Sequence, residues 1–112
     1  MTVATKPETK EAFTIPPDLD VPDDLQDLFR RMRDRLARPR GWCRFISTRA
    51  RADGTIAYCL VGAVTHDADD ARQNERARRV LRSVVGDPVR WNDRFTRKQS
   101  HVIALLDELS TK

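Results

Sequence analysis

The sequence holds little of what membrane-spanning, collagen-like or disulfide-stabilised proteins need. Of its 112 residues only 6% are aromatic, four are glycines and two are cysteines. No apolar run approaches the roughly 20 residues that span a bilayer, and two cysteines are too few for a disulfide framework. Residues 1–11 are polar and have no apolar segment typical of a secretory signal. We therefore expect a cytoplasmic protein with reduced thiols that does not contact a membrane.

What the chain does contain is charge and enough apolar residues for one core. Charged residues make up 34% and apolar residues 39%, with a formal net charge of +4. Of the 21 basic residues 17 are arginines, whose planar guanidinium suits phosphate or carboxylate partners. Acidic residues are interspersed among them, however, so composition alone does not predict a nucleic-acid-binding protein.

The chain divides into a leader and a single domain. Residues 1–20 are expected to form a flexible leader, because Lys, Glu and Thr dominate and no apolar period is present. Phe13 and Ile15 offer this leader a way to dock, although a disordered tail is the stronger expectation. Residues 21–112 are expected to form one compact helical domain.

Apolar residues that recur every three or four positions predict four helices. We expect these helices over residues 22–37, 58–66, 69–85 and 97–110. Thr96 and Gln99 predict a capping box at the start of the last helix. The apolar positions expected in the core are Leu28, Phe29, Met32, Leu60, Ala63, Val80, Leu81, Val84, Trp91, Leu105 and Leu106.

A short β-ribbon is expected between the first two helices. Residues 43–48 and 55–58 are rich in strand formers, and the pair Asp53-Gly54 between them is typical of a hairpin turn. From propensity alone, residues 58–65 are ambiguous between strand and helix. The expected fold is thus mainly α, with a minor β component.

Cys59 is the one candidate nucleophile. A thiol near a helix start has its pKa lowered by the helix dipole, His66 or His101 would supply a base, and Asp93 would orient it. The alternative is that Cys59 is a small buried hydrophobic residue. No cysteine-hydrolase signature is present, so we favour the alternative and assign no catalytic residue. Metal-ligand spacings are also lacking, and neither a metal nor a cofactor is expected.

Trp91, Asn92 and Asp93, expected in the loop between the last two helices, are candidate binding residues together with Trp42. A tryptophan beside two polar side chains is suited to binding a ligand. The same residues are also suited to a tryptophan that packs into the core from a loop, followed by an Asx-type turn. We favour the second interpretation. A pocket, if the protein has one, is expected where Trp42, Cys59 and Trp91 approach one another.

The third predicted helix carries a row of arginines. Arg72, Arg76 and Arg79 share one stripe and Arg82 lies alongside, so the row is able to neutralise phosphates in a salt-dependent way. Acidic residues interleave with the row, which favours a solvated, salt-bridged face instead. Nucleic-acid binding therefore stays an alternative.

Three short motifs carry a resemblance to a known family. The motifs, in chain order, are Gly41-Trp42-Cys43, Cys59-Leu60-Val61-Gly62-Ala63-Val64 and Trp91-Asn92-Asp93. Together with the last helix they resemble the bacterial domain-of-unknown-function family 6197, over about residues 22–110. The resemblance implies a helix-rich fold in which residues 59–65 begin a helix. The family often carries a glutamine soon after the first tryptophan, where this chain has Cys43-Arg44.

No motif assembles a nucleophile, a base and an oxyanion donor. The leading hypothesis is therefore a small non-enzymatic, cytoplasmic binding or regulatory module that acts through a macromolecular partner, which we expect to be an as yet unknown protein. Nucleic-acid binding through the arginine row is the second hypothesis and a Cys59-dependent enzyme is the third. Oligomeric state does not follow from the sequence.

Overall fold

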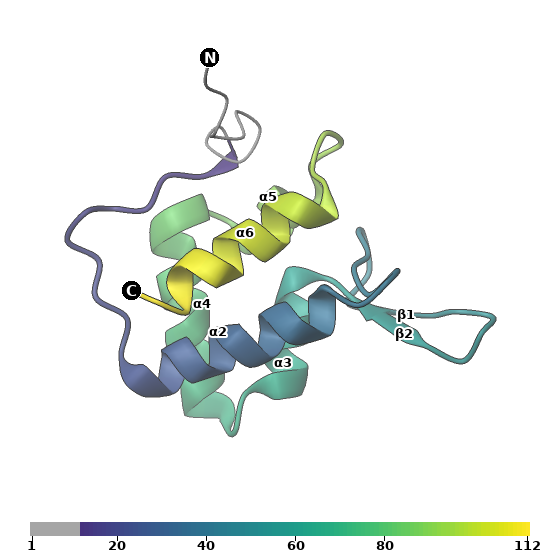
Figure 1. The fold of residues 1–112 in the computed structure, drawn as a ribbon, viewed down its shortest axis with the longest axis horizontal. Helices are drawn as coiled ribbons and strands as arrows, with labels where there is room; N and C mark the ends of the chain where they lie inside the picture. Colours follow the sequence, from purple (N-terminus) through teal and green to yellow (C-terminus); the bar gives the residue numbers. More distant parts are fainter. Residues whose placement is uncertain (1–11) are drawn as a thin grey trace, which may run out of the picture.

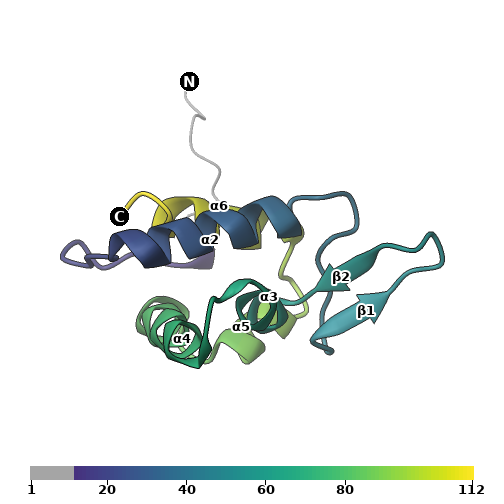
Figure 2. The same cartoon turned by 90° about the horizontal axis from the view of Figure 1, so that it is seen from below.

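The computed structural model describes residues 12–112, which form five helices and one two-stranded sheet (Figure 1). In chain order these are α2 (Asp23–Leu36), β1 (Thr48–Ala50), β2 (Ile56–Tyr58), α3 (Leu60–Asp67), α4 (Ala71–Val85), α5 (Pro88–Asp93) and α6 (Gln99–Leu109). Figure 2 shows two layers, with α2 and α6 in one, α3, α4 and α5 in the other, and the hairpin projecting at one end. The mainly α class with a minor β component is confirmed. Across the described residues no helix is both long and apolar enough to cross a membrane.

Helix α2 lies at the centre of the packing. It contacts α6, α3 and α4, and its residues Leu28, Phe29 and Met32 are fully buried. The spacing of these residues places them on one face of the helix, which is why the periodicity predicts their burial. The other expected core residues are buried as well, except Val80 and Val84, which are half-buried at the edge of α4.

Helix α5 was not expected, and it corrects the predicted loop that holds Trp91, Asn92 and Asp93. The side chain of Asp87 caps the helix by accepting hydrogen bonds from the backbone N–H groups of Val89 (2.9 Å) and Arg90 (3.2 Å). Pro88 occupies the first turn, where its missing N–H removes no helical bond. All three motif residues therefore lie on a helix rather than in a turn.

The β-ribbon forms, but its first strand begins later than expected. Thr48 pairs with Tyr58 in the antiparallel sheet, and Gly54 supplies the turn with φ +88°. Residues 43–47 form no strand, because Phe45 has φ +69° and breaks the extended backbone. The predicted first strand is therefore wrong over residues 43–47 and correct at Thr48, whereas the predicted ribbon and its Asp53-Gly54 turn are confirmed.

The expected capping box of the last helix is also wrong. Helix α6 begins after Lys98, whose backbone N–H donates to Nδ1 of His101 at 3.1 Å. Thr96 lies within a tight turn closed by a hydrogen bond from Arg97 N–H to the Arg94 carbonyl (2.9 Å), so its side chain is not at the helix start.

Part of the expected leader packs on the domain. Phe13, Ile15 and Leu19 lie against the core, and the indole Nε1 of Trp91 donates to the carbonyl of Ala12 at 2.8 Å. Residues 12–20 thus cover apolar surface that the helices leave open. The rest of the expected leader, residues 1–11, lies outside the described part of the chain.

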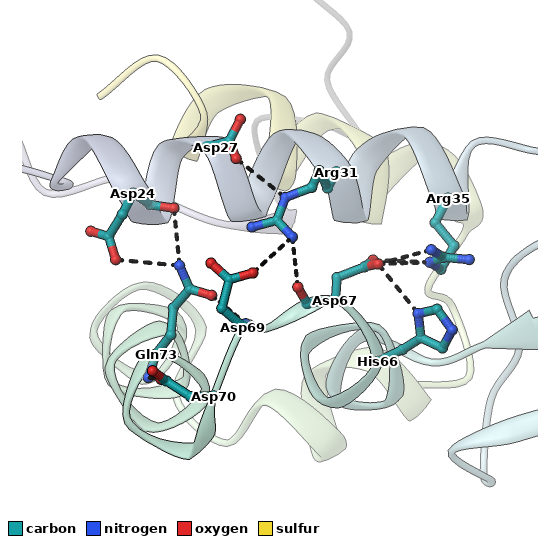
Figure 3. A network of polar contacts seen from close by, with 9 residues as sticks. All are labelled: Asp24, Asp27, Arg31, Arg35, His66, Asp67, Asp69, Asp70 and Gln73. Carbon is teal, nitrogen blue, oxygen red and sulfur yellow. Dashed lines mark hydrogen bonds and ion pairs between the residues drawn. The ribbon is translucent and has the colours of Figure 1, made fainter.

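A network of ion pairs ties α2 to α3 (Figure 3). Arg35 donates to both carboxylate oxygens of the buried Asp67, with Nη2 to Oδ1 at 2.8 Å and Nε to Oδ2 at 2.9 Å. Arg31 donates to the backbone carbonyl of Asp67 at 2.7 Å. Such bidentate pairs fix orientation as well as distance, so the C-terminal end of α3 is held in place against α2.

The pKa of Asp67 reflects this network. Burial raises the pKa of this carboxyl, but hydrogen bonds and positive charge from Arg35 and His66 outweigh burial and hold it below its usual value. A carboxyl with a lowered folded-state pKa stabilises the protein fully above its unfolded pKa. That contribution is lost as the pH falls through the lowered value.

We predict that Asp67→Asn lowers the free energy of unfolding by about 3 kcal/mol near neutral pH, because Arg35 loses its partner. Between about pH 5 and pH 2, the free energy of unfolding of the variant should also fall less steeply with pH than that of the parent protein. Urea unfolding over that range measures both effects. Asp34→Asn, on an exposed carboxyl, is the control and should change stability by less than about 0.5 kcal/mol. An identical pH dependence of Asp67→Asn and the parent protein would contradict this account.

Gly62 allows the loop before β1 to approach α3. The Ser47 carbonyl lies so close to Gly62 that the Cβ of any other residue would collide with it. The same carbonyl accepts the backbone N–H of Cys59 at 3.0 Å. The absence of a Cβ at position 62 is therefore what lets this loop approach the start of the helix.

We predict that Gly62→Ala destabilises the protein by about 3 kcal/mol through this collision. Helix propensity alone would give the opposite sign, a gain of about 1 kcal/mol, so the sign of the change in urea unfolding is decisive. Gly54→Ala is the matched control: a Cβ there meets nothing, and only its positive φ should cost about 1 kcal/mol. A stabilised Gly62→Ala protein would show that the close approach is absent.

Candidate functional site

The side chain of Asn92 joins the three sequence motifs. It is fully buried, and its Oδ1 accepts hydrogen bonds from Nε1 of Trp42 (2.7 Å) and from the backbone N–H of Leu60 (3.0 Å). Its Nδ2 donates to the carbonyl of Cys43 at 3.1 Å. We call these four residues, Trp42, Cys43, Leu60 and Asn92, the Asn92 junction.

The junction sets the position of three elements at once. Leu60 is the first residue of α3, Trp42 and Cys43 precede the hairpin, and Asn92 belongs to α5. A buried polar group that loses its partner costs more free energy than a single bond contributes. The four groups therefore depend on one another, and the motif residues Trp42 and Asn92 act here as structural residues.

Asp93 extends the junction toward the surface. Its Oδ1 accepts from Nδ2 of Asn92 at 3.0 Å and from the backbone N–H of Phe45 at 2.9 Å. The second bond holds Phe45 in the left-handed region, with φ +69°, where a bulky residue is a genuine outlier. A backbone conformation of this kind persists only when its surroundings impose it, and it is common at functional sites.

The strained backbone presents an aromatic ring to solvent. Phe45 is 72% exposed, Ile46 beside it is 48% exposed and Phe95 is 87% exposed. Nη1 of Arg44 donates to the carbonyl of Phe95 at 3.1 Å and so links the two loops. We call Phe45, Ile46 and Phe95 the Phe45–Phe95 surface.

Sequence reasoning did not find this surface. Phe45 lies in a segment predicted as strand, where a large apolar residue is expected to be half-buried. Phe95 stands alone among polar residues, and that isolation was the available signal, because a residue outside any apolar period has no helix face to bury it.

The two thiols are buried, and each makes a structural hydrogen bond. Sγ of Cys59 accepts from the backbone N–H of Gly62 at 3.3 Å and so caps α3. Sγ of Cys43 donates to the carbonyl of Ile46 at 3.4 Å, and burial raises the pKa of the Cys43 thiol. Deep, bonded thiols of this kind suit packing better than nucleophilic attack.

The structure does not connect the three weak catalytic candidates. Cys59 is 6% exposed and bonds Gly62, Nδ1 of His101 accepts from Lys98, and Asp93 bonds Phe45 and Asn92. Within residues 12–112 no hydrogen bond joins Cys59 to an imidazole. In the same residues no group of three or more His, Cys, Asp or Glu side chains is arranged to hold a metal ion.

Trp91 makes its ring contacts outside the Asn92 junction. Its ring packs under the guanidinium of Arg97, 4.0 Å from the ring centroid, and against the edge of Phe13 at 6.5 Å. The cavity that Trp91 lines is bounded by α5 and its flanking loops, by Val85 at the end of α4 and by Ala12, without Trp42 or Cys59. The expected pocket shared by these three residues is therefore not the one that Trp91 lines.

The arginine row of α4 is partly paired. Arg76 makes two bonds to the carboxylate of Asp24, at 2.8 and 2.9 Å, and Arg79 lies 3.4 Å from Glu75. Arg72 and Arg82 are exposed on the same helix. The interhelical pair to Asp24 gives Arg76 a structural partner, while nucleic-acid binding by the row stays a prediction.

The fold and the junction define a small helical domain whose β-hairpin is fixed to the helices by a buried asparagine. The chain belongs to the family of unknown function DUF6197, whose family model matches residues 20–111. No curated protein and no solved structure matches the chain.

We predict that Asn92→Ala lowers the free energy of unfolding by about 3 kcal/mol, because Trp42 Nε1, Leu60 N–H and the Cys43 carbonyl all lose their partner. Chemical denaturation measures the change. Asn74→Ala is the matched control, since within residues 12–112 the Asn74 side chain bonds only the side chain of Arg78 on the same helix. It should change stability by less than about 0.5 kcal/mol. Equal losses in the two variants would refute the central role of Asn92.

Proposed function

We propose that this protein is a small non-enzymatic binding module that acts through a protein partner, and that the partner docks on the Phe45–Phe95 surface. The observation that carries the proposal is the 72% exposed ring of Phe45 on a left-handed backbone that Asp93 holds in place. Both the strained backbone and the exposed apolar ring oppose folding. A binding role explains why the protein retains them.

The chemistry of the surface indicates what the partner offers. Aromatic residues are typical anchors of protein interfaces. Arg44 and Arg94 flank Phe45 and Phe95 in the chain, and Arg94 is exposed. The carboxylate of Asp93 accepts a hydrogen bond from the backbone N–H of Phe45. The partner surface should therefore combine an apolar centre with an acidic rim.

The surface is prepared for binding before a partner arrives. Phe45 is held through its backbone N–H and Phe95 through its carbonyl, so both rings extend from fixed main chain. A preorganised surface loses less conformational entropy on association than a mobile one. We further propose that the module acts in the cytoplasm, where its two free thiols, Cys43 and Cys59, stay reduced.

We predict that Phe45→Gly stabilises the isolated protein by about 1 kcal/mol, because glycine adopts φ +69° without strain and little burial is lost. The same substitution should abolish partner binding. Ile46→Gly is the control, at a position without positive φ, and should destabilise the protein by about 1 kcal/mol. A loss of stability in Phe45→Gly would show that Phe45 is part of the fold rather than a displayed ligand.

Partner binding itself is tested by photo-crosslinking in the source cells. A photoreactive residue placed at position 45 or 95 should capture one and the same protein, and a second substitution, Ile46→Asp, should remove it. The same photoreactive residue at Arg72, on the exposed side of α4, serves as the control. Capture of unrelated proteins from positions 45 and 95, or the same pattern from position 72, would contradict the proposal.

A further inference from the structure

Arg97 is a buried cation without a carboxylate partner among the described residues. The residue is 5% exposed. Its Nε donates to the Trp91 carbonyl at 2.8 Å, and its guanidinium lies over the Trp91 ring. No hydrogen bond or ion pair joins its two terminal nitrogens to residues 12–112. Burying a charge without a counter-charge is costly, so this arrangement calls for an explanation.

The surroundings of Arg97 add positive charge instead of neutralising it. Arg97 lines a cavity of about 340 Å³ together with Trp91, Arg90, Arg94 and Asp87. Burial and the positive charge of Arg94 lower the pKa of Arg97, yet a guanidinium stays charged at neutral pH. One oxygen of Asp87 already accepts the N–H groups of Val89 and Arg90. Three arginines against one aspartate leave the cavity with a charge of +2.

We propose that this cavity binds a phosphate monoester, held by Arg97 at its base and by Arg90 and Arg94 at its opening. A dianion matches the charge of the cavity, and guanidinium groups bind phosphate oxygens through pairs of parallel hydrogen bonds. The buried position of Arg97 strengthens its attraction to an anion, because little water screens it. The volume accommodates a phosphoryl group and a small organic part.

Trp91 gives Arg97 its fixed direction. The indole ring supports one face of the guanidinium at 4.0 Å and the Trp91 carbonyl holds Nε, which leaves the opposite edge of the guanidinium for the ligand. The ring is itself fixed through Nε1 to Ala12. The site is thus preformed. It adjoins the Phe45–Phe95 surface through Arg94, which lines the cavity and precedes Phe95 in the chain, but it does not rest on the proposed partner binding.

The test uses the full chain at low ionic strength, titrated with inorganic phosphate, glycerol 2-phosphate and acetate. The indole N–H resonance of Trp91 should shift with both phosphates, while that of Trp42 should stay in place. Glycerol 2-phosphate binding more tightly than inorganic phosphate identifies the ester, and the reverse overturns that part of the proposal. Acetate, with one charge, should bind at least about fivefold more weakly than glycerol 2-phosphate.

The matched variants are Arg94→Gln and Arg72→Gln, both on exposed arginines, so that neither should impair folding. Arg94→Gln should weaken binding of glycerol 2-phosphate about tenfold, because one charge-assisted contact is lost, and Arg72→Gln should leave it unchanged. The proposal is overturned by equal effects of the two variants, by equal affinities for acetate and glycerol 2-phosphate, or by an unshifted Trp91 resonance at about 10 mM ligand.

Discussion

The hydrogen bonds of Asn92 are the constraint on which the rest of the structure depends. One buried amide bonds the indole of Trp42, the first backbone N–H of α3 and the carbonyl of Cys43. Apolar packing brings helices together but is not directional. The hydrogen bonds of the Asn92 amide, by contrast, are satisfied in only one relative arrangement of α3, α5 and the segment before the hairpin. The position of the hairpin, the start of α3 and the conformation of Phe45 all follow from that placement.

The two candidate sites share α5 and its flanking residues. Asn92 and Asp93 hold Phe45 and its exposed ring. Trp91 supports the guanidinium of Arg97, which has no carboxylate partner within residues 12–112. Three consecutive residues of a six-residue helix thus position both features. This sharing gives the Trp-Asn-Asp motif a physical meaning: each side chain fixes a different part of the surrounding chain, and none of them needs to act as a catalyst.

Local patterns in the sequence predict much of this fold, and long-range polar contacts account for what they miss. The apolar stripe of α2 predicts its buried face, because burial follows helical period. The same reasoning fails for α5, whose six residues are too few to show a helical period. It also fails for residues 43–47, where a contact between Phe45 and Asp93, 48 positions apart, overrides strand propensity. That Arg97 has no carboxylate partner in the described part of the chain also cannot be predicted from the sequence, because the sequence shows which residues are charged but not which of them pair.

The claim that Asn92 organises the molecule is tested most directly by hydrogen exchange. The backbone N–H of Leu60 and the indole N–H of Trp42 both donate to a side chain rather than to regular backbone structure. If the junction opens only when the protein unfolds, both hydrogens should exchange with the free energy of global unfolding, as the core amides of α2 do. Exchange of either hydrogen near the rate of an unprotected group, with α2 still protected, would contradict the account.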